Sequence, residues 1–307
     1  MLGRIAGAVR FKEPLTFHTS LRIGGPADFF IMPRDLDDLC YAMAFAEQED
    51  LPVFVLGGGN DVLVSDRGVQ AVVLKLLGVF GRAEFQGTEV AVGAGMSLSG
   101  LIRDAAAQNL GGLECLAGIP ASVGGALATN AGTREGSIID FCSAVYFLHP
   151  NGTLGEFRPL AGTGQAFDFP PGSIFVGCRL QLVRRPAATI HKDVQQRLKQ
   201  RHAAKPLALA TAGYIWKDPP GDSAARLIEA AGLRGKRVHD AEICTKSGNL
   251  IVNRGEASHD DVLALMEMTQ ERVETHFAIT LRPEIRMLGF HAPSALEAEP
   301  LEPAGAR

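Results

Sequence analysis

Two glycine-rich segments hold the residues whose types and spacing point most directly to chemistry. The first, residues 57–61, follows the apolar run Val53–Leu56, and the second, residues 118–126, comes later in the chain. Glycine permits tight turns whose backbone N–H groups all face one way, and such a nest binds an anion such as a pyrophosphate. A single glycine-rich turn is more often a plain hairpin or loop. Two of them in this order favour a dinucleotide site.

Neither segment matches the best-known phosphate-binding motifs. The fingerprint G-x-G-x-x-G lies between a strand and a helix, whereas residues 57–59 lead into Val62–Val64, an apolar run typical of another strand. The glycine-rich motif of nucleoside triphosphatases, with its lysine, is absent as well. We therefore expect a phosphate site built from loops between strands and not from a helix N-terminus.

Further segments surround these two in a fixed order. They comprise residues 19–28, 129–132, 212–228, 248–253 and 281–286. Together with the glycine-rich segments, they closely resemble the FAD-dependent UDP-N-acetylenolpyruvoylglucosamine reductases (MurB, also called UDP-N-acetylmuramate dehydrogenases) of bacterial cell-wall synthesis. The resemblance extends over about residues 15–290. It implies an oxidoreductase that uses FAD and NADPH and takes a UDP-sugar as its small-molecule substrate.

The resemblance also implies which residues contact FAD. These are Arg22, Gly57, Gly58, Gly59, Asn60, Asp61, Gly118, Ile119, Pro120, Ser122, Gly124, Gly125 and Asn130. The first turn departs from the family, because Asn60 and Asp61 stand where serine and asparagine are usual. Asp61 brings a carboxylate toward an anion unless it turns away, so we expect weaker flavin binding than in typical members. Arg22, Asn130 and the Ser122 hydroxyl are compensating groups.

The family's reaction reduces an enolpyruvyl C=C bond. NADPH gives a hydride to FAD, the reduced flavin gives a hydride to substrate carbon C3, and a proton then reaches C2. The protein must supply a dry flavin slot, a cation for the carboxylate on which charge develops, and a positioned acid. Glu284, within the run Pro283–Arg286, matches the family's catalytic glutamate.

Two other catalytic positions depart from the family. Tyr214 stands where the family has a serine. A phenol can donate a proton, but the larger side chain can equally fill the pocket as an aromatic plug, and both interpretations stay open. Gln165 stands where the family has an arginine, and glutamine lacks the charge that stabilises an enolate. Lys217 is a candidate for the substrate's phosphate or carboxylate, although an exposed lysine needs no such role.

Three functions are therefore open at this point. The first is a working reductase of the family's substrate, with Tyr214 or water as the acid and with Arg134, Arg158 or Arg201 supplying the missing charge. The second is an FAD-binding oxidoreductase with a different acceptor, whose pocket Tyr214 and Trp216 have reshaped. The third is a non-catalytic relative with a binding or regulatory role.

An α+β fold must position these residues. The resemblance implies a two-lobed FAD-binding region, of the PCMH or vanillyl-alcohol-oxidase type, followed by a C-terminal α/β lobe that binds substrate. We place the three lobes at residues 15–77, 78–187 and 205–291, with a basic helical connector at 188–204 and a disordered tail at 292–307. A run rich in alanine, proline and glutamate is typical of such a tail.

Hydrophobic spacing predicts the elements of each lobe. We expect helices at residues 35–46, 98–108, 223–232 and 260–277, with Asp35 and Ser258 or His259 as N-terminal caps. We expect strands at residues 53–56, 62–64, 72–76, 89–93, 144–148 and 173–176.

Composition excludes several classes of protein. A formal net charge of −4 gives no general attraction to nucleic acid, and no apolar run approaches the ~20 residues that span a bilayer. The five cysteines are widely spaced, and no cysteine–histidine cluster has the spacing of a metal site, so we expect free buried thiols and no metal. The N-terminal residues do not form a signal peptide, and we expect a cytoplasmic protein. Nothing identifies a protein partner.

Overall fold

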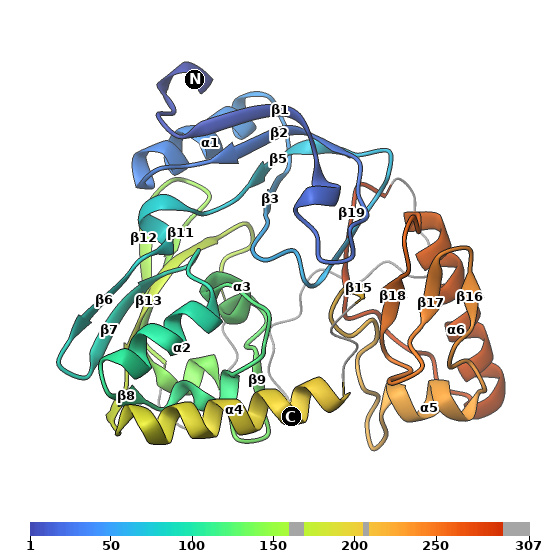
Figure 1. The fold of residues 1–307 in the computed structure, drawn as a ribbon. Coiled ribbons are helices and arrows are strands. Elements are labelled where there is room, and N and C mark those ends of the chain that lie inside the picture. Colours follow the sequence, from blue (N-terminus) through green and yellow to red (C-terminus); the bar gives the residue numbers. More distant parts are fainter. Residues whose placement is uncertain (160–168, 205–208, 291–307) are drawn as a thin grey trace.

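The fold consists of three main β-sheets with helices packed against them. In the computed structural model, residues 1–159, 169–204 and 209–290 are described. Two sheets and their helices form one half of the molecule, and the third sheet forms the other half (Figure 1). In the part of the chain that the structure describes, no helix has the length and apolar character needed to cross a membrane.

The first sheet has the strand order β1-β2-β5-β3, with one helix on it. Its elements are β1 (Ala8–Pro14), β2 (Pro26–Met32), α1 (Leu36–Gln48), β3 (Val53–Val55) and β5 (Val69–Leu74). The β5 strand pairs in parallel with both β2 and β3. Helix α1 begins where the Asp35 carboxylate accepts a hydrogen bond from the Asp38 N–H at 3.0 Å, as the sequence predicts.

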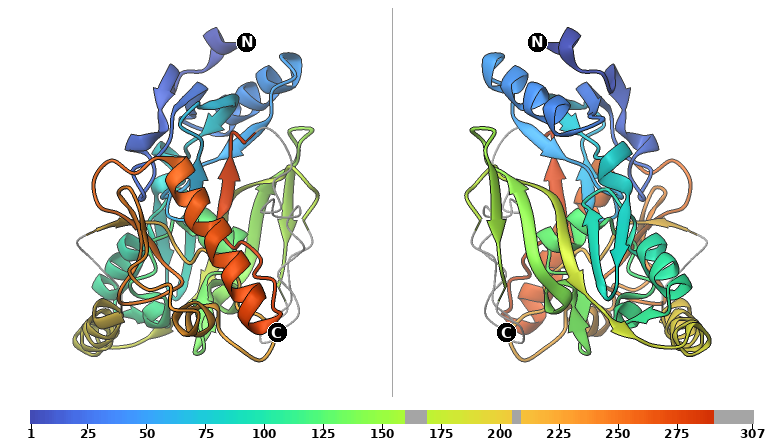
Figure 2. Two further views of the ribbon diagram at one scale, coloured as in Figure 1. Left: turned by 90° about the vertical axis from the view of Figure 1, so that its right-hand side faces the viewer. Right: turned by 90° about the vertical axis from the view of Figure 1, so that its left-hand side faces the viewer.

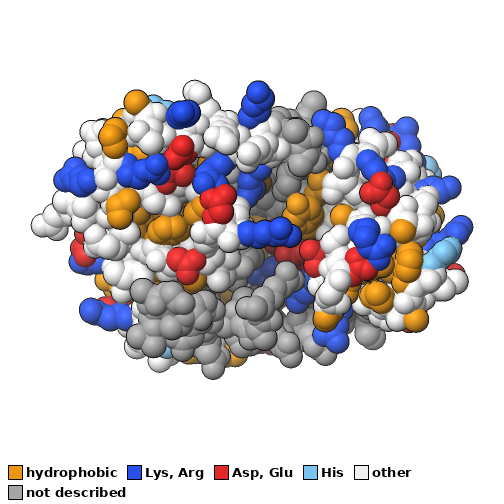
Figure 3. Space-filling view, turned by 90° about the horizontal axis from the view of Figure 1, so that it is seen from below, with side chains coloured by type: hydrophobic (Ala, Val, Ile, Leu, Met, Phe, Trp, Pro, Cys, Tyr) orange, Lys and Arg blue, Asp and Glu red, His pale blue; other side chains and the backbone are white. Residues whose placement is uncertain are grey.

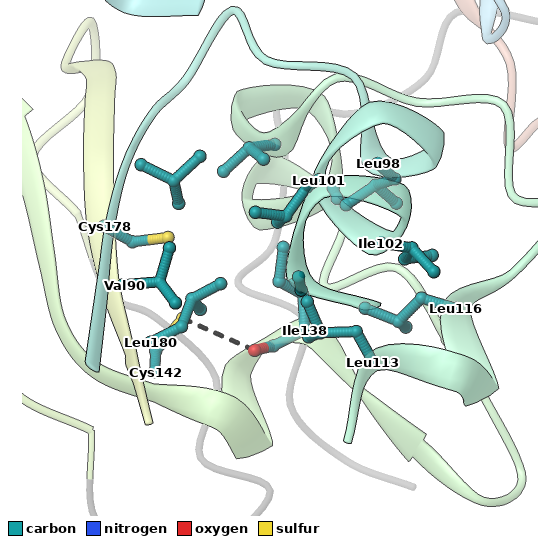
Figure 4. Packing of buried hydrophobic residues seen from close by; sticks show 14 of the residues in the cluster. Val90, Leu98, Leu101, Ile102, Leu113, Leu116, Ile138, Cys142, Cys178 and Leu180 are labelled. Atoms are coloured by element: carbon teal, nitrogen blue, oxygen red, sulfur yellow. Dashed lines mark hydrogen bonds between the residues drawn. The ribbon is translucent and has the colours of Figure 1, made fainter. Parts of the chain in front are cut away.

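The second sheet has the order β12-β11-β13-β7-β6 and is antiparallel throughout. Its strands are β6 (Ala83–Gln86), β7 (Glu89–Gly93), β11 (Cys142–Leu148), β12 (Leu154–Phe157) and β13 (Ile174–Gln181). The associated helices are α2 (Leu98–Ala107), α3 (Val123–Ala128) and α4 (Ala187–Ala204). Figure 4 shows the core between sheet and helices, where Val90 and Leu180 face Leu98, Leu101 and neighbouring apolar side chains.

The third sheet has the order β15-β18-β17-β16. Its elements are β15 (Ala210–Thr211), α5 (Ala224–Ala230), β16 (Arg237–Val238), β17 (Ala241–Ile243), β18 (Ile251–Asn253) and α6 (His259–Phe277). Helix α6 lies across the outer side of this half (Figure 2). Ser258 caps it, accepting a hydrogen bond from the Asp261 N–H while the Asp261 carboxylate accepts one from the Ser258 N–H.

Two strands connect the halves of the molecule. The last strand, β19 (Arg286–Leu288), pairs in parallel with β4 (Val62–Val64), and Arg286 lies opposite Val62. The β4 strand follows the first glycine-rich turn, so the C-terminal segment returns to that turn (Figure 1). This pairing brings residues from the end of the chain to the predicted phosphate site.

Shorter elements complete the described chain. They are η1 (Leu2–Arg4), η2 (Leu15–Phe17), η3 (Gly78–Gly81), β8 (Leu110–Gly111), η4 (Leu113–Leu116), β9 (Gly132–Thr133), β10 (Gly136–Ser137), η5 (Ile138–Phe141) and β14 (Val183–Arg184).

Most predicted elements are confirmed, with small shifts at their ends. The helix expected at 98–108 is α2, the helix at 260–277 is α6, and the strand at 89–93 is β7. The basic connector expected at 188–204 lies within α4. All five cysteines are free thiols, as expected, and only Cys40 among them is partly exposed. The predicted tail at 292–307 lies outside the described residues, and the lobe boundaries stay predictions.

Candidate active site

A cavity of about 960 Å³ lies between the first two sheets. Apolar side chains of α1 and β3 form one wall, and residues of β13 and the α3 segment form the other. This volume is at the upper end of the range for small-molecule sites, as a ligand of dinucleotide size requires. Eight residues that the sequence predicted as cofactor contacts line the cavity. They are Gly57, Gly58, Asn60, Ile119, Pro120, Ser122, Gly124 and Gly125.

The first glycine-rich turn connects β3 to β4, as the sequence predicted. Gly59 has φ +65°, and a methyl group there would lie 2.0 Å from the carbonyl oxygen of His18. Its own carbonyl accepts a hydrogen bond from the Ser20 N–H at 2.8 Å. Gly59 therefore anchors the turn against the segment before β2, while Gly57 and Gly58 face the cavity.

The second segment corrects part of the sequence prediction. It opens helix α3 and is not a loop between strands, because the Ser122 hydroxyl caps the helix and accepts a hydrogen bond from the Gly125 N–H at 3.1 Å. Gly124 is packed on β7's continuation, where a methyl group would lie 2.9 Å from the Ala94 side chain. The two segments also meet, since a methyl group at Gly57 would lie 2.6 Å from the Ser122 hydroxyl oxygen.

Five of the predicted contacts do not line this cavity. They are Arg22, Gly59, Asp61, Gly118 and Asn130. Arg22 is exposed, and Gly118 faces the side chain of Arg201 on α4. The side-chain oxygen of Asn130 is buried and has no hydrogen-bond partner among the described residues.

The polar residues of the cavity wall that sequence reasoning missed include Lys75, Ser173 and Arg286. The Ser173 hydroxyl is buried with no hydrogen-bond partner in the described part of the chain. Such an orphaned group fits a cavity whose ligand carries donors and acceptors. Burial lowers the pKa of the Lys75 ammonium, so this cation is set into the wall. A lone charge in the apolar run 72–76 was the available signal for Lys75.

Asp61 turns away from the cavity and toward the C-terminal half. Its carboxylate oxygen lies 3.2 Å from the position of a methyl group built on Gly213, and its carbonyl accepts a hydrogen bond from the Arg286 N–H at 3.2 Å. Burial raises the pKa of the Asp61 carboxyl to about 6, although the positive charge of Arg286 acts in the opposite direction. The Asp61 carboxylate therefore points away from the cavity, where the sequence analysis expected it to approach the anion of a ligand.

Tyr214 and Glu284 come together on two hydrogen-bonded segments. The Glu284 N–H donates to the carbonyl of Ile215 at 2.8 Å, and the Gly213 N–H donates to the carbonyl of Asn60 at 2.5 Å. The predicted catalytic residues thus lie directly beside the first glycine-rich turn. The Tyr214 side chain is 45% exposed, so it is not packed into the core.

The buried side-chain amide of Asn249 holds the segment that follows Tyr214 in place. Asn249 is almost fully buried, accepts a hydrogen bond from the Trp216 N–H at 2.8 Å and donates one to the Trp216 carbonyl at 2.7 Å. The exposed Lys217 continues the same segment, and its N–H donates to the Arg282 carbonyl. Gln165, the second predicted substrate contact, lies outside the described residues. No group of three or more metal-ligating side chains occurs among the residues that the structure describes.

Comparison with known proteins first defines the class. Residues 27–158 match the model of an FAD-binding domain. The cavity between two sheets, with its glycine turns and buried orphan hydroxyl, fits that cofactor. The chain is a flavoprotein with an FAD-binding domain of the PCMH type.

Further comparisons define the family. Residues 205–288 match the model of the UDP-N-acetylenolpyruvoylglucosamine reductase C-terminal domain. UDP-N-acetylenolpyruvoylglucosamine reductase 2 of Symbiobacterium thermophilum is 39% identical over 94% of each chain, and the reductase of Moorella thermoacetica is 38% identical over 91% of this chain and 92% of its own. A crystal structure of the reductase (MurB) from Thermus caldophilus, 36% identical, superposes with a TM-score of 0.79 over 92% of this chain and 100% of its own. The chain belongs to the UDP-N-acetylenolpyruvoylglucosamine reductase family.

Substitution of Gly57 by alanine tests the contact between the two glycine-rich segments. The added methyl group would lie 2.6 Å from the Ser122 hydroxyl oxygen, so turn and helix must move apart. We expect Gly57→Ala to weaken FAD binding by about tenfold or more, because overpacking costs on the order of 1–3 kcal/mol. Fluorescence titration of the apoprotein with FAD measures this. Gly81→Ala is the matched control, since nothing lies within 4 Å of a methyl group there, and equal affinities of the two variants would contradict the expectation.

The pKa of Asp61 predicts a pH-dependent stability. Because that pKa is raised to about 6, the folded protein binds this proton more tightly than the unfolded chain. The stabilisation is complete at low pH and is lost as pH rises through about 6. We expect Asp61→Asn to raise the free energy of unfolding of the apoprotein by about 2 kcal/mol at pH 8 and by about half as much at pH 5.

Urea unfolding at the two pH values measures this difference. The control is Asp37→Asn, which changes an exposed aspartate of α1 and should shift stability little at either pH. A gain for Asp61→Asn that is the same at pH 5 and pH 8 would show that Asp61 does not titrate in this interval.

Proposed function

We propose that this protein reduces UDP-N-acetylenolpyruvoylglucosamine to UDP-N-acetylmuramate in peptidoglycan synthesis, with FAD as its bound cofactor and NADPH as the reductant. Membership of the family supports the reaction. The observation that carries the assignment to this site is that the segments of Tyr214 and Glu284 are hydrogen-bonded to each other and to the first glycine-rich turn. Acid groups and cofactor cavity are thereby neighbours.

The residues of the cavity suit the binding of FAD. FAD, when bound there, would supply the hydride chemistry that connects NADPH to carbon C3 of the enolpyruvyl group. The Gly57–Asn60 turn offers backbone N–H groups to the diphosphate, and Lys75 offers a positive charge. The apolar side chains of α1 and β3 exclude water from the ring systems.

We assign the proton donor for C2 to Tyr214. A plug would be buried against the core, whereas this side chain is 45% exposed and follows a backbone segment fixed by Asn60 and Asn249. Its hydroxyl is a general acid of the kind that contributes about 10²–10⁴-fold to rate. Glu284, on the adjoining segment, acts with it in the proton transfer. Lys217 lies three residues beyond Tyr214 and meets the substrate's phosphate groups, with Gln165 as a further contact.

The setting of the reaction follows from its reactants. NADPH and a nucleotide-activated sugar are both cytoplasmic compounds, and five free cysteines suit a reducing compartment. We therefore propose a cytoplasmic location.

Anaerobic absorbance spectroscopy tests the function directly. We expect NADPH to bleach the flavin absorbance of the FAD-loaded protein, and the enolpyruvyl sugar to restore it. Glu284→Gln should retain bleaching by NADPH but slow the restoration by about 100-fold, because only the second step needs the proton. Bleaching without restoration in the wild type would point to a different acceptor. A protein that gives no flavin spectrum would have a binding or regulatory role.

Substitution of Tyr214 by phenylalanine separates an acid from a plug. The ring is retained and only the hydroxyl is lost, so we expect flavin reoxidation by the enolpyruvyl sugar to slow by about 100-fold or more. Reduction by NADPH should keep its rate. Tyr214→Ser, which restores the family's residue, should be faster than Tyr214→Phe. A Tyr214→Phe protein as fast as the wild type would remove the phenol from the mechanism.

A further inference from the structure

A small pocket of about 260 Å³ lies where α4 passes the segment after α3. Three of its lining residues are arginines, Arg134, Arg197 and Arg201, and one is an acid, Glu135. The pocket lies on the α4 side of the molecule. Figure 3 views that side, where the surface is hollowed between the two halves and lysine and arginine side chains lie at the edges. Three cations beside one carboxylate favour an anionic ligand.

The three arginines differ in their exposure and in whether a carboxylate already pairs with them. Arg197 forms an ion pair with Glu135 at 2.5 Å, and Arg134 is exposed. Arg201 is only partly exposed, and among the described residues no carboxylate lies within ion-pair distance of it. A guanidinium that is partly desolvated and lacks a carboxylate partner is suited to bind one from a ligand.

The position of Arg201 is fixed by the second glycine-rich segment. A methyl group at Gly118 would lie 2.8 Å from Cδ and 3.8 Å from Nε of Arg201, so the arginine stem rests on the glycine. Gly118 directly precedes Ile119 and Pro120, which line the FAD cavity. Arg201 therefore lies at the edge of the cofactor site.

Arg201 also lies near Tyr214, the proposed acid. Burial lowers the pKa of the Arg201 guanidinium, while the phenol of Tyr214 acts on it in the opposite direction. Arg197, in contrast, interacts with the carboxylates of Glu135 and Asp193. Of the three arginines that the sequence analysis considered as a source of charge, Arg158 is excluded, because it is 78% exposed and pairs with Glu156 on β12.

The chemistry of the substrate requires its acid and its cation to be neighbours. In an enolpyruvyl group the carboxylate is bonded directly to C2. When a hydride adds to C3, the C=C electron pair moves toward C2 and the carboxylate, and the proton from the acid then closes the C–H bond at C2. The group that binds the carboxylate must lie within a few ångströms of the group that protonates C2, since one bond separates the two sites.

We propose that Arg201 binds the carboxylate of the enolpyruvyl group and stabilises the negative charge that develops there, in place of the arginine that Gln165 replaces. The inference rests on the proposed function and adds a catalytic residue to it. The planar guanidinium matches a carboxylate in a fork of two N–H donors. Gly118 fixes the arginine stem at the edge of the cofactor site, and the Arg197–Glu135 pair holds the neighbouring turn of α4.

The test compares two ligands that differ in the carboxylate. UDP-N-acetylenolpyruvoylglucosamine carries it, and UDP-N-acetylglucosamine has the same nucleotide and sugar without it. We expect Arg201→Gln to weaken calorimetric binding of the first ligand to the oxidised FAD-loaded protein by about tenfold or more. Binding of the second should change less than about twofold. Reoxidation by the enolpyruvyl sugar should slow by about 100-fold, with the rate of NADPH reduction unchanged.

Control variants separate this role from a structural one. Arg158→Gln makes the same substitution at an exposed arginine and should match the wild type in every measurement. Arg201→Lys keeps the charge without the fork, so it should bind the enolpyruvyl sugar more tightly than Arg201→Gln. It also provides the test if Arg201→Gln does not fold.

Two results would overturn the inference about Arg201 and leave the proposed function intact. One is equal weakening of both ligands, which assigns Arg201 to the shared diphosphate. The other is unchanged binding and reoxidation in Arg201→Gln and Arg201→Lys. If the wild-type protein itself, reduced by NADPH, is not reoxidised by the enolpyruvyl sugar, the proposed function fails and the inference fails with it.

Discussion

The parallel pairing of β19 with β4 is the constraint on which the site depends. The β4 strand begins directly after the first glycine-rich turn, and β19 begins two residues after Glu284. The backbone hydrogen bonds from Arg286 to Asp61 and from Gly213 to Asn60 extend this contact to both sides of the turn. The first glycine-rich turn and the segments of Tyr214 and Glu284 are therefore held in fixed positions relative to one another. A slip of one residue would exchange the two faces of β19 and move Glu284 with it.

Partly buried charged groups in and around the site lower the stability of the folded chain. Burial lowers the pKa of Lys75 and of Arg201 and raises that of Asp61, so each of these groups loses favourable hydration in its charged form. An anionic ligand returns a counter-charge to the two cations. Ligand binding thus stabilises the folded chain, and the structure keeps its unfavourable charges where binding compensates for them. The same reasoning applies to the buried hydroxyl of Ser173, because a ligand can supply the hydrogen-bond partner that this hydroxyl lacks among the described residues.

Local patterns in the sequence predicted much of the fold, and the parts that depend on long-range pairing were beyond them. The cap of α1 at Asp35, the cap of α6 at Ser258 and the strand β7 could be derived from residues close in the chain. The turn at 57–59 was correctly placed between strands. The segment after Gly118 was not, because the Ser122 cap and the short helix α3 are difficult to distinguish from a glycine-rich loop by composition alone.

The same division holds for the candidate site. Glycines that face the cavity could be identified from a motif, whereas Lys75, Ser173 and Arg286 enter it through sheet pairings between distant residues. The direction of the Asp61 carboxylate could not be predicted either, since it depends on Gly213 lying beside it. The distance along the sequence between residues that meet in the site, and not their chemical type, decided which of them could be predicted.

In the proposed function, Tyr214 in place of the family's serine changes where the acid lies. The backbone on both sides is fixed by Gly213 and Ile215, whose hydrogen bonds reach the glycine-rich turn and Glu284. A phenol extends its hydroxyl several ångströms farther from this backbone than a serine does. The cation that accompanies the acid must shift by a similar amount, because the substrate's carboxylate and C2 are one bond apart. An arginine on α4 is consistent with such a joint displacement. Under the proposed function, the departures at 165 and 214 are therefore one coupled change in the position of charge and proton.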